Sequence, residues 1–283
     1  MGKIIDGKKI AQKIRKNLKT QVEKFDNEGR KPGLSVVLVG DNPASQTYVN
    51  MKEKDAQEIG IYSDMHHLDS DTSQKELIEL VQSLNENDKV DGILVQLPLP
   101  EHINSTEVID SINPAKDVDG FHPVNTGRLF NGQEDKLRFE PCTPIGIMEL
   151  LVRHIDIDGK NAVIVGRSNI VGKPVAHLLL AEHATITICH SHTTSLKEET
   201  LRADILIAAA GRPELITGDM VKEGATVIDV GINRVDGELV GDVEFDKAKK
   251  KAKYITPVPG GVVPMTRAML MKNVIKARKN HGI

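Results

Sequence analysis

The fold is decided by residues Val163–Pro174, which read VIVGRSNIVGKP. An apolar run of valine and isoleucine leads into Gly166, and a segment with helical character begins at Gly172. A buried strand, a glycine turn and a helix in this order favour a dinucleotide-binding βα unit, in which a pyrophosphate lies against the free N–H groups of the helix N-terminus. The spacing is not G-x-G-x-x-G, so the alternative of a plain βα turn that needs glycine for its geometry stays open.

The same alternation of short β-branched runs and longer amphipathic runs extends along the rest of the chain. Thr143 is an expected N-cap, with Pro144 at the first helical position. The expected helices cover residues 7–28, 44–59, 73–84, 145–154, 172–181 and 265–277. The expected strands cover residues 34–39, 61–68, 92–96, 161–165, 185–189, 205–208 and 226–230. Strands that alternate with helices predict an α/β fold with parallel sheets and right-handed crossovers.

Residues 112–140 interrupt this alternation, because prolines and glycines punctuate them and no strong period survives. A length of 283 residues suits one large domain or two domains of ordinary size. The segment is therefore the expected connection between two domains.

Composition excludes several classes of function. The chain has 37 Lys and Arg against 40 Asp and Glu, and this balance argues against binding to nucleic acid as a bulk polyanion. Aromatic residues make up 3% and Trp is absent, which argues against base-stacking platforms. Cys142 and Cys189 are not at C-x-x-C spacing and are expected to be reduced thiols. The sequence shows neither a secretory signal nor an apolar run near the ~18 residues of a membrane span, so a soluble, cytoplasmic protein without a membrane partner is expected.

The residues after the strand at 185–189 indicate the type of cofactor. NAD-dependent enzymes typically have a carboxylate there, which accepts hydrogen bonds from the ribose hydroxyls, whereas this strand is followed by HSHT at 190–193. Ser191 can donate a hydrogen bond to a 2′-phosphate, and Arg167 can pair with it as a bidentate cation. This pattern favours NADP over NAD. The alternative is that Ser191 is an ordinary turn residue.

Three patches in the first half carry side chains suited to chemistry. Tyr48 and Lys52 are four residues apart on an expected helix and share a face, as surface pairs also do. Gln96 closes an apolar strand where parallel sheets place ligands, which is also where an ordinary strand ends. Asp117 and Asp119 flank a valine before a glycine turn, where they can bind a polar heterocycle or form an Asx-rich turn. A metal would need more ligands than this last patch supplies, and none is expected.

Six motifs occur in order along the chain and together resemble the bifunctional methylenetetrahydrofolate dehydrogenase/methenyltetrahydrofolate cyclohydrolase family, often called FolD. The motifs are YVNMK at 48–52, VQLPLP at 95–100, KDVDGFHP at 116–123, PCTP at 141–144, VGRSNIVGKP at 165–174 and PVPGGV at 257–262. The resemblance covers essentially the whole length. It implies an N-terminal α/β catalytic and folate domain at 1–120, to which 264–283 return, and a Rossmann-type NADP-binding domain at 140–263. Folate and cofactor would lie in the cleft between the two domains.

The resemblance also implies the activity. 5,10-Methylenetetrahydrofolate is oxidised by NADP⁺ to the 5,10-methenyl form, which is then hydrolysed to 10-formyltetrahydrofolate. Such an enzyme serves one-carbon metabolism, including purine, methionine and histidine biosynthesis, and is expected to be a homodimer. Hydride transfer needs mainly alignment of two planar rings, whereas ring opening needs a group that moves a proton.

Site residues follow from the matching positions. Lys52 would be the general acid/base of the hydrolytic step, Tyr48 would line the pterin side, and Gln96 would hold Lys52. Asp119 would anchor the pterin by hydrogen bonds to ring nitrogens. The expected NADP contacts are Gly166, Arg167, Ser168, Ser191 and Ile232, the last through its backbone.

One departure stands out, because the family motif P-G-G-V-G-P-M-T here has Val263 in place of its third glycine. A residue before proline is pushed toward extended geometry, which valine tolerates, so we expect a negative φ at Val263 and no strain. The alternative is that the loop needs a positive φ there, in which case valine is strained and the geometry of the substrate loop is altered. Two rival functions remain at this stage. One is another NADP-dependent dehydrogenase, of the shikimate dehydrogenase kind, and the other is a non-enzymatic nucleotide-binding protein that Val263 has disabled.

Overall fold

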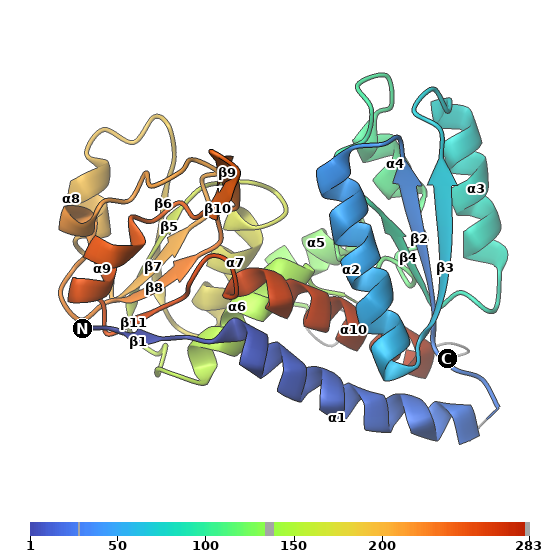
Figure 1. Ribbon diagram of the computed structural model, residues 1–283, viewed down its shortest axis with the longest axis horizontal. Coiled ribbons are helices and arrows are strands. Elements are labelled where there is room, and N and C mark those ends of the chain that lie inside the picture. The colour runs from blue at the N-terminus through green and yellow to red at the C-terminus, as the bar shows by residue number, and fades with distance from the viewer. Residues whose placement is uncertain (28, 134–138, 281–283) are drawn as a thin grey trace. The chain divides into compact units, whose positions relative to one another are not determined.

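The computed structural model describes residues 1–27, 29–133 and 139–280, which form two compact units (Figure 1). One unit consists of Met1–Ala11 with Thr143–Thr266 and is called here the six-stranded unit. The other consists of Gln12–Cys142 with the chain from Arg267 onward and is called the three-stranded unit. The domain limits expected from the sequence stay a prediction. Parts of three expected segments lie outside the described residues: Glu28 of the first helix, 134–138 of the connection and 281–283 of the returning end.

The sheet of the six-stranded unit is parallel throughout and has the order β1-β11-β8-β7-β5-β6. The chain leaves β5 for β6 on one side and then returns to β7 on the other side. The gap between the carboxyl ends of β5 and β7 is therefore a topological switch point, where open α/β sheets bind ligands. The strands are β1 (Lys3–Ile4), β5 (Asn161–Val165), β6 (Thr185–Cys189), β7 (Ile205–Ala208), β8 (Thr226–Asp229) and β11 (Tyr254–Ile255).

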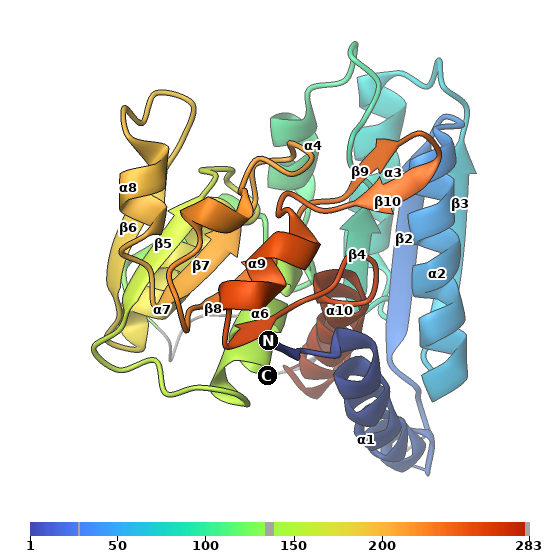
Figure 2. The same cartoon turned by 60° about the vertical axis from the view of Figure 1, so that its left-hand side comes forward.

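Helices cover both faces of this sheet (Figures 1 and 2). Helices α8 and α9 lie on one face, where Val163, Leu206 and Val227 pack with Ala248 in a continuous apolar cluster. The other face is covered by α6 and α7. An antiparallel hairpin, β9 with β10, follows β8. The remaining elements are α6 (Cys142–Val152), α7 (Gly172–Ala181), α8 (Leu196–Thr200), a 3₁₀ turn η1 (Gly218–Met220), β9 (Asn233–Val235), β10 (Glu238–Val240) and α9 (Phe245–Lys251).

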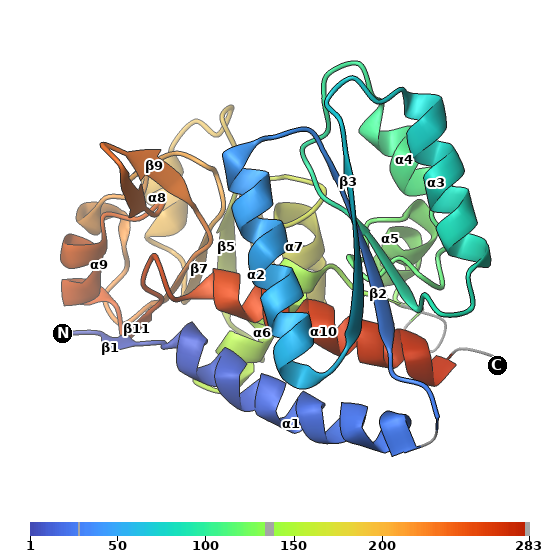
Figure 3. The ribbon, with the colours of Figure 1, turned by 45° about the vertical axis from the view of Figure 1, so that its right-hand side comes forward.

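The three-stranded unit has a parallel sheet of order β3-β2-β4, with α2 on one face and α3 and α4 on the other (Figure 3). Val37, Ile93 and Val95 of the sheet pack against Leu77 and Val81 of α3. Because the chain goes from β2 to β3 and then to β4 on the opposite side, a second switch point lies between β2 and β4. The elements are β2 (Gly33–Val39), α2 (Pro43–Ile59), β3 (Tyr62–Leu68), α3 (Gln74–Glu86), β4 (Gly92–Val95), α4 (Ser105–Ser111) and α5 (Pro123–Phe130).

Two long helices, α1 (Gly7–Asn27) and α10 (Val262–Asn280), contribute residues to both units. The α/β fold class is confirmed, and the seven expected strands agree with the observed strands to within one residue at each end. The expected start of the helix at 145–154 is wrong, because α6 begins at Cys142. Thr143 is already helical, and its hydroxyl oxygen lies 2.9 Å from that of Thr266 instead of capping.

Local sequence explains where helix α2 begins and ends. The Asn42 side chain accepts hydrogen bonds from the N–H groups of Ala44 and Ser45, and Pro43 occupies the first turn. Gly60 ends the helix with a φ of 86°, a left-handed conformation that favours glycine. This helix carries Tyr48 and Lys52, so its fixed register sets where both side chains lie.

Within the described residues, no helix is both long enough and apolar enough to cross a membrane.

Candidate active site

Lys52 and Gln96 meet at the switch point of the three-stranded sheet. The Lys52 side chain is buried, with 9% of its surface exposed, and its Nζ donates a hydrogen bond to Gln96 Oε1 at 3.0 Å. Gln96 directly follows β4 and is held at both ends: its backbone N–H donates to Val37 O, and its Nε2 donates to Leu97 O. The amide oxygen of Gln96 is therefore oriented toward the ammonium group.

The two carboxylates that follow β4 have different surroundings. Asp117 is buried and accepts four hydrogen bonds, from the N–H groups of Gly120, Phe121 and His122 and from Asn125 Nδ2. It forms the Asx-type turn that the sequence left open, and it shapes the loop. Asp119 is partly exposed and makes none of these contacts. The structure thus separates a loop-building aspartate from one that is available to a ligand.

Asp119 lies among groups that affect its charge. Burial raises the pKa of Asp119, while the nearby Lys52 charge opposes that rise and Asp117 adds to it. The neighbouring Cys142 side chain also favours the carboxylate. Lys52 makes no ion pair within 4.0 Å among the described residues, so its charge acts on Asp119 through space.

Cys142 and Asn273 support this corner and were not singled out as functional from the sequence. Burial raises the pKa of the Cys142 thiol well above its ordinary value, so the thiol stays protonated and donates to Val118 O at 3.2 Å. Asn273 Nδ2 also donates to Val118 O, at 2.8 Å. The available signal was an asparagine among apolar residues of the last helix, since a buried amide needs partners.

Tyr48 is half-buried one helical turn before Lys52. Burial raises the pKa of the Tyr48 hydroxyl, and the positive charge of Arg267 opposes that rise. Arg267 Nη1 donates to Met51 O at 3.3 Å and lies 3.3 Å from Asp55 Oδ2. Arg267 and Asp55 were also missed in the sequence, although Asp55 has the helical spacing that puts it on the face of Lys52.

The expected NADP residues lie at the carboxyl edge of the six-stranded sheet. Val165 of β5 pairs with Cys189 of β6, so Arg167 and Ser191 each stand two residues beyond a paired position on neighbouring strands. Gly166 has a φ of 131°, and a Cβ atom there would lie 2.1 Å from Ala209 O. Only glycine fits such a turn, which brings the backbone close to the switch point.

Ser168 accepts hydrogen bonds at the start of α7, where free N–H groups were expected to bind the pyrophosphate. Its Oγ accepts from the N–H groups of Val171 and Gly172, so these donors are already satisfied. Among the described residues, the N–H groups of 167–170 find no acceptor, and these turn residues are exposed. The donors that can meet a phosphate are thus in the turn itself and on Arg167.

The residues present fit an NADP cofactor. The tight Gly166 turn lies at the switch point, Arg167 supplies a cation, and no carboxylate occurs at 190–193 to repel a 2′-phosphate. The Thr193 hydroxyl accepts from the His190 N–H and the His190 ring accepts from the His192 N–H, which shapes the loop around Ser191. Ile232, 39% exposed, follows the end of β8 at the same edge.

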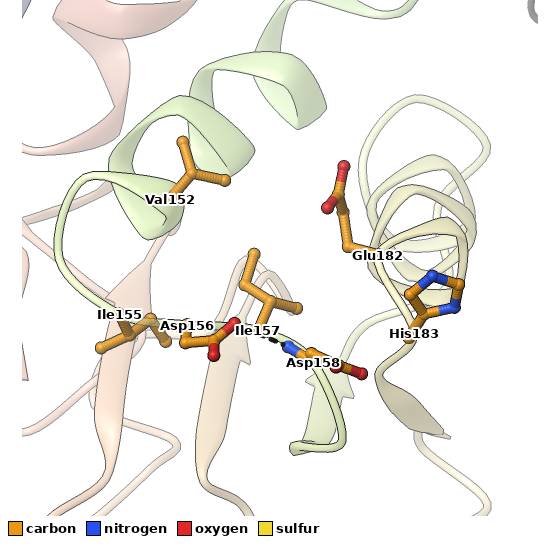
Figure 4. Close-up of a pocket in the computed structure, with 7 residues that line it drawn as sticks. All are labelled: Val152, Ile155, Asp156, Ile157, Asp158, Glu182 and His183. Carbon is orange, nitrogen blue, oxygen red and sulfur yellow. Dashed lines mark hydrogen bonds between the residues drawn. The ribbon is translucent and has the colours of Figure 1, made fainter.

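A surface pocket of about 440 Å³ lies elsewhere in the six-stranded unit (Figure 4). Its lining includes Asp156, Asp158 and Glu182, and the Asp158 N–H donates to Asp156 Oδ1 at 3.3 Å. None of the nine candidate site residues lines it. In the described part of the chain, no three His, Cys, Asp or Glu side chains are grouped so that they can hold a metal ion.

Two family models match this chain and together span most of it. One, described as the catalytic domain of tetrahydrofolate dehydrogenase/cyclohydrolase, matches residues 5–119. The other, described as the NAD(P)-binding domain of the same enzyme, matches residues 141–282.

Individual proteins are similar over the whole length. The "Bifunctional protein FolD" of Halothermothrix orenii is 68% identical, with 100% of both chains covered. The crystal structure of the FolD methylenetetrahydrofolate dehydrogenase/cyclohydrolase of Campylobacter jejuni is 51% identical with a TM-score of 0.96, over 99% of both chains. The FolD structure from Trypanosoma brucei, complexed with NADP cofactor and inhibitor, is 42% identical with a TM-score of 0.95, over 99% of this chain and 98% of that one.

Proposed function

The chain belongs to the tetrahydrofolate dehydrogenase/cyclohydrolase family, and on that basis we propose that Lys52, held by Gln96, is the acid/base of the hydrolytic step. The protein is an NADP-dependent methylenetetrahydrofolate dehydrogenase and methenyltetrahydrofolate cyclohydrolase. It oxidises 5,10-methylenetetrahydrofolate to the 5,10-methenyl form and hydrolyses that product to 10-formyltetrahydrofolate. The identity over both domains disfavours the rival reading as a shikimate-type dehydrogenase.

The dehydrogenase step needs alignment more than acid/base help. When bound, NADP⁺ accepts the hydride that leaves the carbon bridging N5 and N10 of the folate. The resulting methenyl cation is stabilised by both nitrogens, so this step releases no proton that a side chain must take. We assign the anchoring of the pterin to Asp119, whose carboxylate accepts hydrogen bonds from ring N–H groups, and the lining of the ring to Tyr48.

The hydrolytic step requires proton movement. Water attacks the methenyl carbon, and its oxygen loses both protons as it becomes the formyl oxygen. The bond from carbon to N5 breaks, and N5 takes up one proton. One net proton is released. Lys52 is the proposed group that takes and returns the proton.

The observation that supports this assignment best is the Lys52–Gln96 hydrogen bond. The hydrogen-bond partner of the ammonium is a neutral amide and not a carboxylate, so among the described residues proton loss breaks no ion pair within 4.0 Å. Because Gln96 is itself fixed by two hydrogen bonds, it sets the position of Nζ at the ligand end of β4.

Five residues are proposed to bind the cofactor. Gly166 and Ser168 form the turn that approaches the pyrophosphate, and Ile232 offers its backbone. Arg167 and Ser191 are proposed to bind the 2′-phosphate that distinguishes NADP from NAD, the guanidinium by a bidentate pair and the hydroxyl as a donor.

The finer biological setting is also a proposal. We propose a cytoplasmic homodimer that supplies one-carbon units to purine, methionine and histidine biosynthesis. Sedimentation analysis tests the oligomeric state, with a mass near twice 31.0 kDa expected.

One assay tests the proposed chemistry. Methylenetetrahydrofolate and NADP⁺ are mixed with the protein, and the absorbance of the methenyl product is followed as it rises and then decays by hydrolysis. Shikimate with NADP⁺ is the control substrate and should give no reduction. NADP⁺ binding without turnover of either folate would instead support the non-enzymatic reading.

A further inference from the structure

Two buried aspartates, Asp229 and Asp242, interlock at the carboxyl end of β8. Asp229 is the last residue of β8, and Asp242 follows the hairpin β9–β10. The N–H of Asp242 donates to Asp229 Oδ1 at 2.9 Å, and the N–H of Val243 donates to Asp229 Oδ2 at 3.0 Å. Both side chains are buried, with 3% and 0% of their residue surfaces exposed.

Two glycines make this interlock possible. A Cβ atom on Gly231 would lie 2.1 Å from Asp242 Oδ1, and one on Gly241 would lie 1.9 Å from Asp229 Oδ2. Each carboxylate is therefore packed against the backbone beside the other aspartate, and no larger residue fits at either glycine. The pair closes the base of the hairpin.

Asp242 also holds a loop that follows the neighbouring strand β7. Its carboxylate accepts from three consecutive N–H groups, those of Ala210, Gly211 and Arg212, at 2.6, 2.8 and 2.9 Å. Such a series of N–H groups forms a concave anion site, which is filled here by a side chain of the protein itself.

This loop supports the turn to which cofactor binding is assigned. Gly166 packs so closely on the loop that its missing Cβ would lie 2.1 Å from Ala209 O and 3.4 Å from Ala210 N. Ala210, the residue after Ala209, donates its N–H to the Asp242 carboxylate. A chain of direct contacts thus runs from the Asp242 carboxylate to the Gly166 turn.

The pair holds the Ile232 segment as well. Ile232 lies between two residues that are hydrogen-bonded to the aspartates. The Gly231 N–H donates to Asp229 Oδ1, and Asn233 Nδ2 donates to Asp242 Oδ1 at 2.9 Å. Neither aspartate has a cation within 4.0 Å among the described residues, so backbone and amide donors stabilise the pair. Burial raises the pKa of Asp229 to about 7, which shows how costly its charge is there.

We propose that Asp229 and Asp242 are positioning residues for NADP binding, fixing both the loop beneath the Gly166 turn and the segment that presents Ile232. The proposal rests on the assignment of Gly166 and Ile232 to the cofactor site. A dispensable surface pair would not require two glycines and three consecutive backbone donors. Neither aspartate is assigned contact with the cofactor; each acts through the loops it holds.

The test compares Asp242→Ala, Asp242→Asn and Asn233→Ala with Asp204→Asn. Asp204 precedes β7 at the opposite, amino edge of the sheet, where its carboxylate pairs with Lys222 at 2.6 Å, so it controls for loss of a carboxylate. Amide hydrogen exchange is measured on the cofactor-free protein, NADP⁺ affinity by calorimetry, and thermal unfolding for each variant. KM for NADP⁺ and kcat are measured separately.

In Asp242→Ala we expect faster exchange at 210–212 and a dissociation constant for NADP⁺ raised about tenfold or more, with kcat at saturating NADP⁺ within about threefold of the parent. Asp242→Asn keeps the shape and should recover part of the affinity. Asn233→Ala removes one donor and should weaken binding about two- to fivefold, which keeps the test informative if Asp242→Ala does not fold. Asp204→Asn should leave the affinity unchanged.

Unchanged NADP⁺ affinity in folded Asp242→Ala and Asn233→Ala, with the parent active on methylenetetrahydrofolate, would overturn the positioning role. A loss of NADP⁺ affinity that only parallels the loss of thermal stability across the variants would also overturn it, because the two aspartates would then have a purely structural role. If the variants bind NADP⁺ more weakly as expected but the parent protein does not turn over folate, the positioning role stands and the proposed reaction is wrong.

Discussion

Lys52 Nζ lies 3.0 Å from Gln96 Oε1, and this hydrogen bond joins helix α2 to the residue that follows β4. The two residues are 44 positions apart in the chain, so the contact exists only when β2, α2 and β4 are all in place. A correctly folded three-stranded unit therefore presents the amine in one position, and the two residues can be tested separately.

Replacing Lys52 by methionine is expected to abolish the cyclohydrolase and to leave part of the dehydrogenase activity. Methionine has a similar length but moves no proton, and only ring opening needs proton transfer. A loss of about 10²–10⁴-fold in the hydrolysis rate is typical of removing an acid/base. The decay of added methenyltetrahydrofolate measures it, and decay at the parent rate would exclude Lys52 from this role.

Gln96→Ala should slow hydrolysis about tenfold while Lys52 is still present, because the amine loses the acceptor that fixes its position. The hydride-transfer rate should fall less. Gln57→Ala is the matched control, since Gln57 lies on the same helix but is exposed and its side chain donates to Glu53. Equal rates in the two variants would show that Gln96 does not position Lys52.

Asp119→Ala is expected to weaken folate binding and to impair both activities. A hydrogen bond to a charged group contributes about 1.5–3 kcal/mol, which corresponds to about a ten- to 150-fold loss of affinity. Asp117→Ala should instead lower the free energy of unfolding, because four donors lose their buried acceptor. Calorimetry with folate and urea unfolding distinguish the two, and unchanged folate affinity in Asp119→Ala would remove this residue from the site.

Val263→Gly is expected to give a slightly less stable enzyme with dehydrogenase activity within a few-fold of the parent. Val263 lies in the first turn of α10 and is not among the non-glycine residues with positive φ, which in the described chain are His183, Glu214 and Asp236. The expected negative φ is confirmed, but the expected extended geometry is wrong, because Val263 is helical although Pro264 follows it. Glycine therefore relieves no strain and only loosens the unfolded chain, at a cost of about 0.4–1 kcal/mol. A large joint gain in stability and turnover would contradict this.

The free energy of unfolding should depend on pH through Asp229. Its pKa is about 7 in the folded protein, raised by burial, against about 3.9 in an unfolded chain. Between these values the folded state keeps a proton that the unfolded state releases, so stability falls as pH rises from about 4 to about 7, with a slope of up to about 1.4 kcal/mol per pH unit. Urea unfolding at several pH values gives the free energy of unfolding, which should depend less steeply on pH in Asp229→Asn than in the parent. The same pH dependence in both proteins would contradict the role of Asp229.

The fold was largely predictable because most of its strands are short apolar runs and because helices such as α2 and α3 carry side-chain caps. The sequence did not reveal α5, because Pro123 and Gly127 read as breaks. Pro123 in fact occupies the first turn, and His122 Nδ1 accepts from the Val124 N–H. The two-residue strands β1 and β11 carry no period at all and form only because they pair with each other and with β8.

The site was less predictable where tertiary contacts decide the role of a residue. The spacing of Tyr48 and Lys52 could be read from one helix. No local pattern indicates that Asp117 accepts hydrogen bonds from its own loop while Asp119 makes none of these bonds. Arg267 reaches Asp55 from 212 residues further along the chain. The pairing of Asp229 with Asp242 depends on the hairpin β9–β10, which brings the two residues together.

The pairing of β1 with β11 constrains the order in which the protein can be completed during translation. Lys3 and Ile4 are synthesised 251 residues before their partners Tyr254 and Ile255. This edge of the six-stranded sheet therefore stays open, and β1 stays unpaired, until Tyr254 and Ile255 have been made. Any stall in elongation before residue 255 leaves this edge exposed to chaperones or to the same edge of another nascent chain.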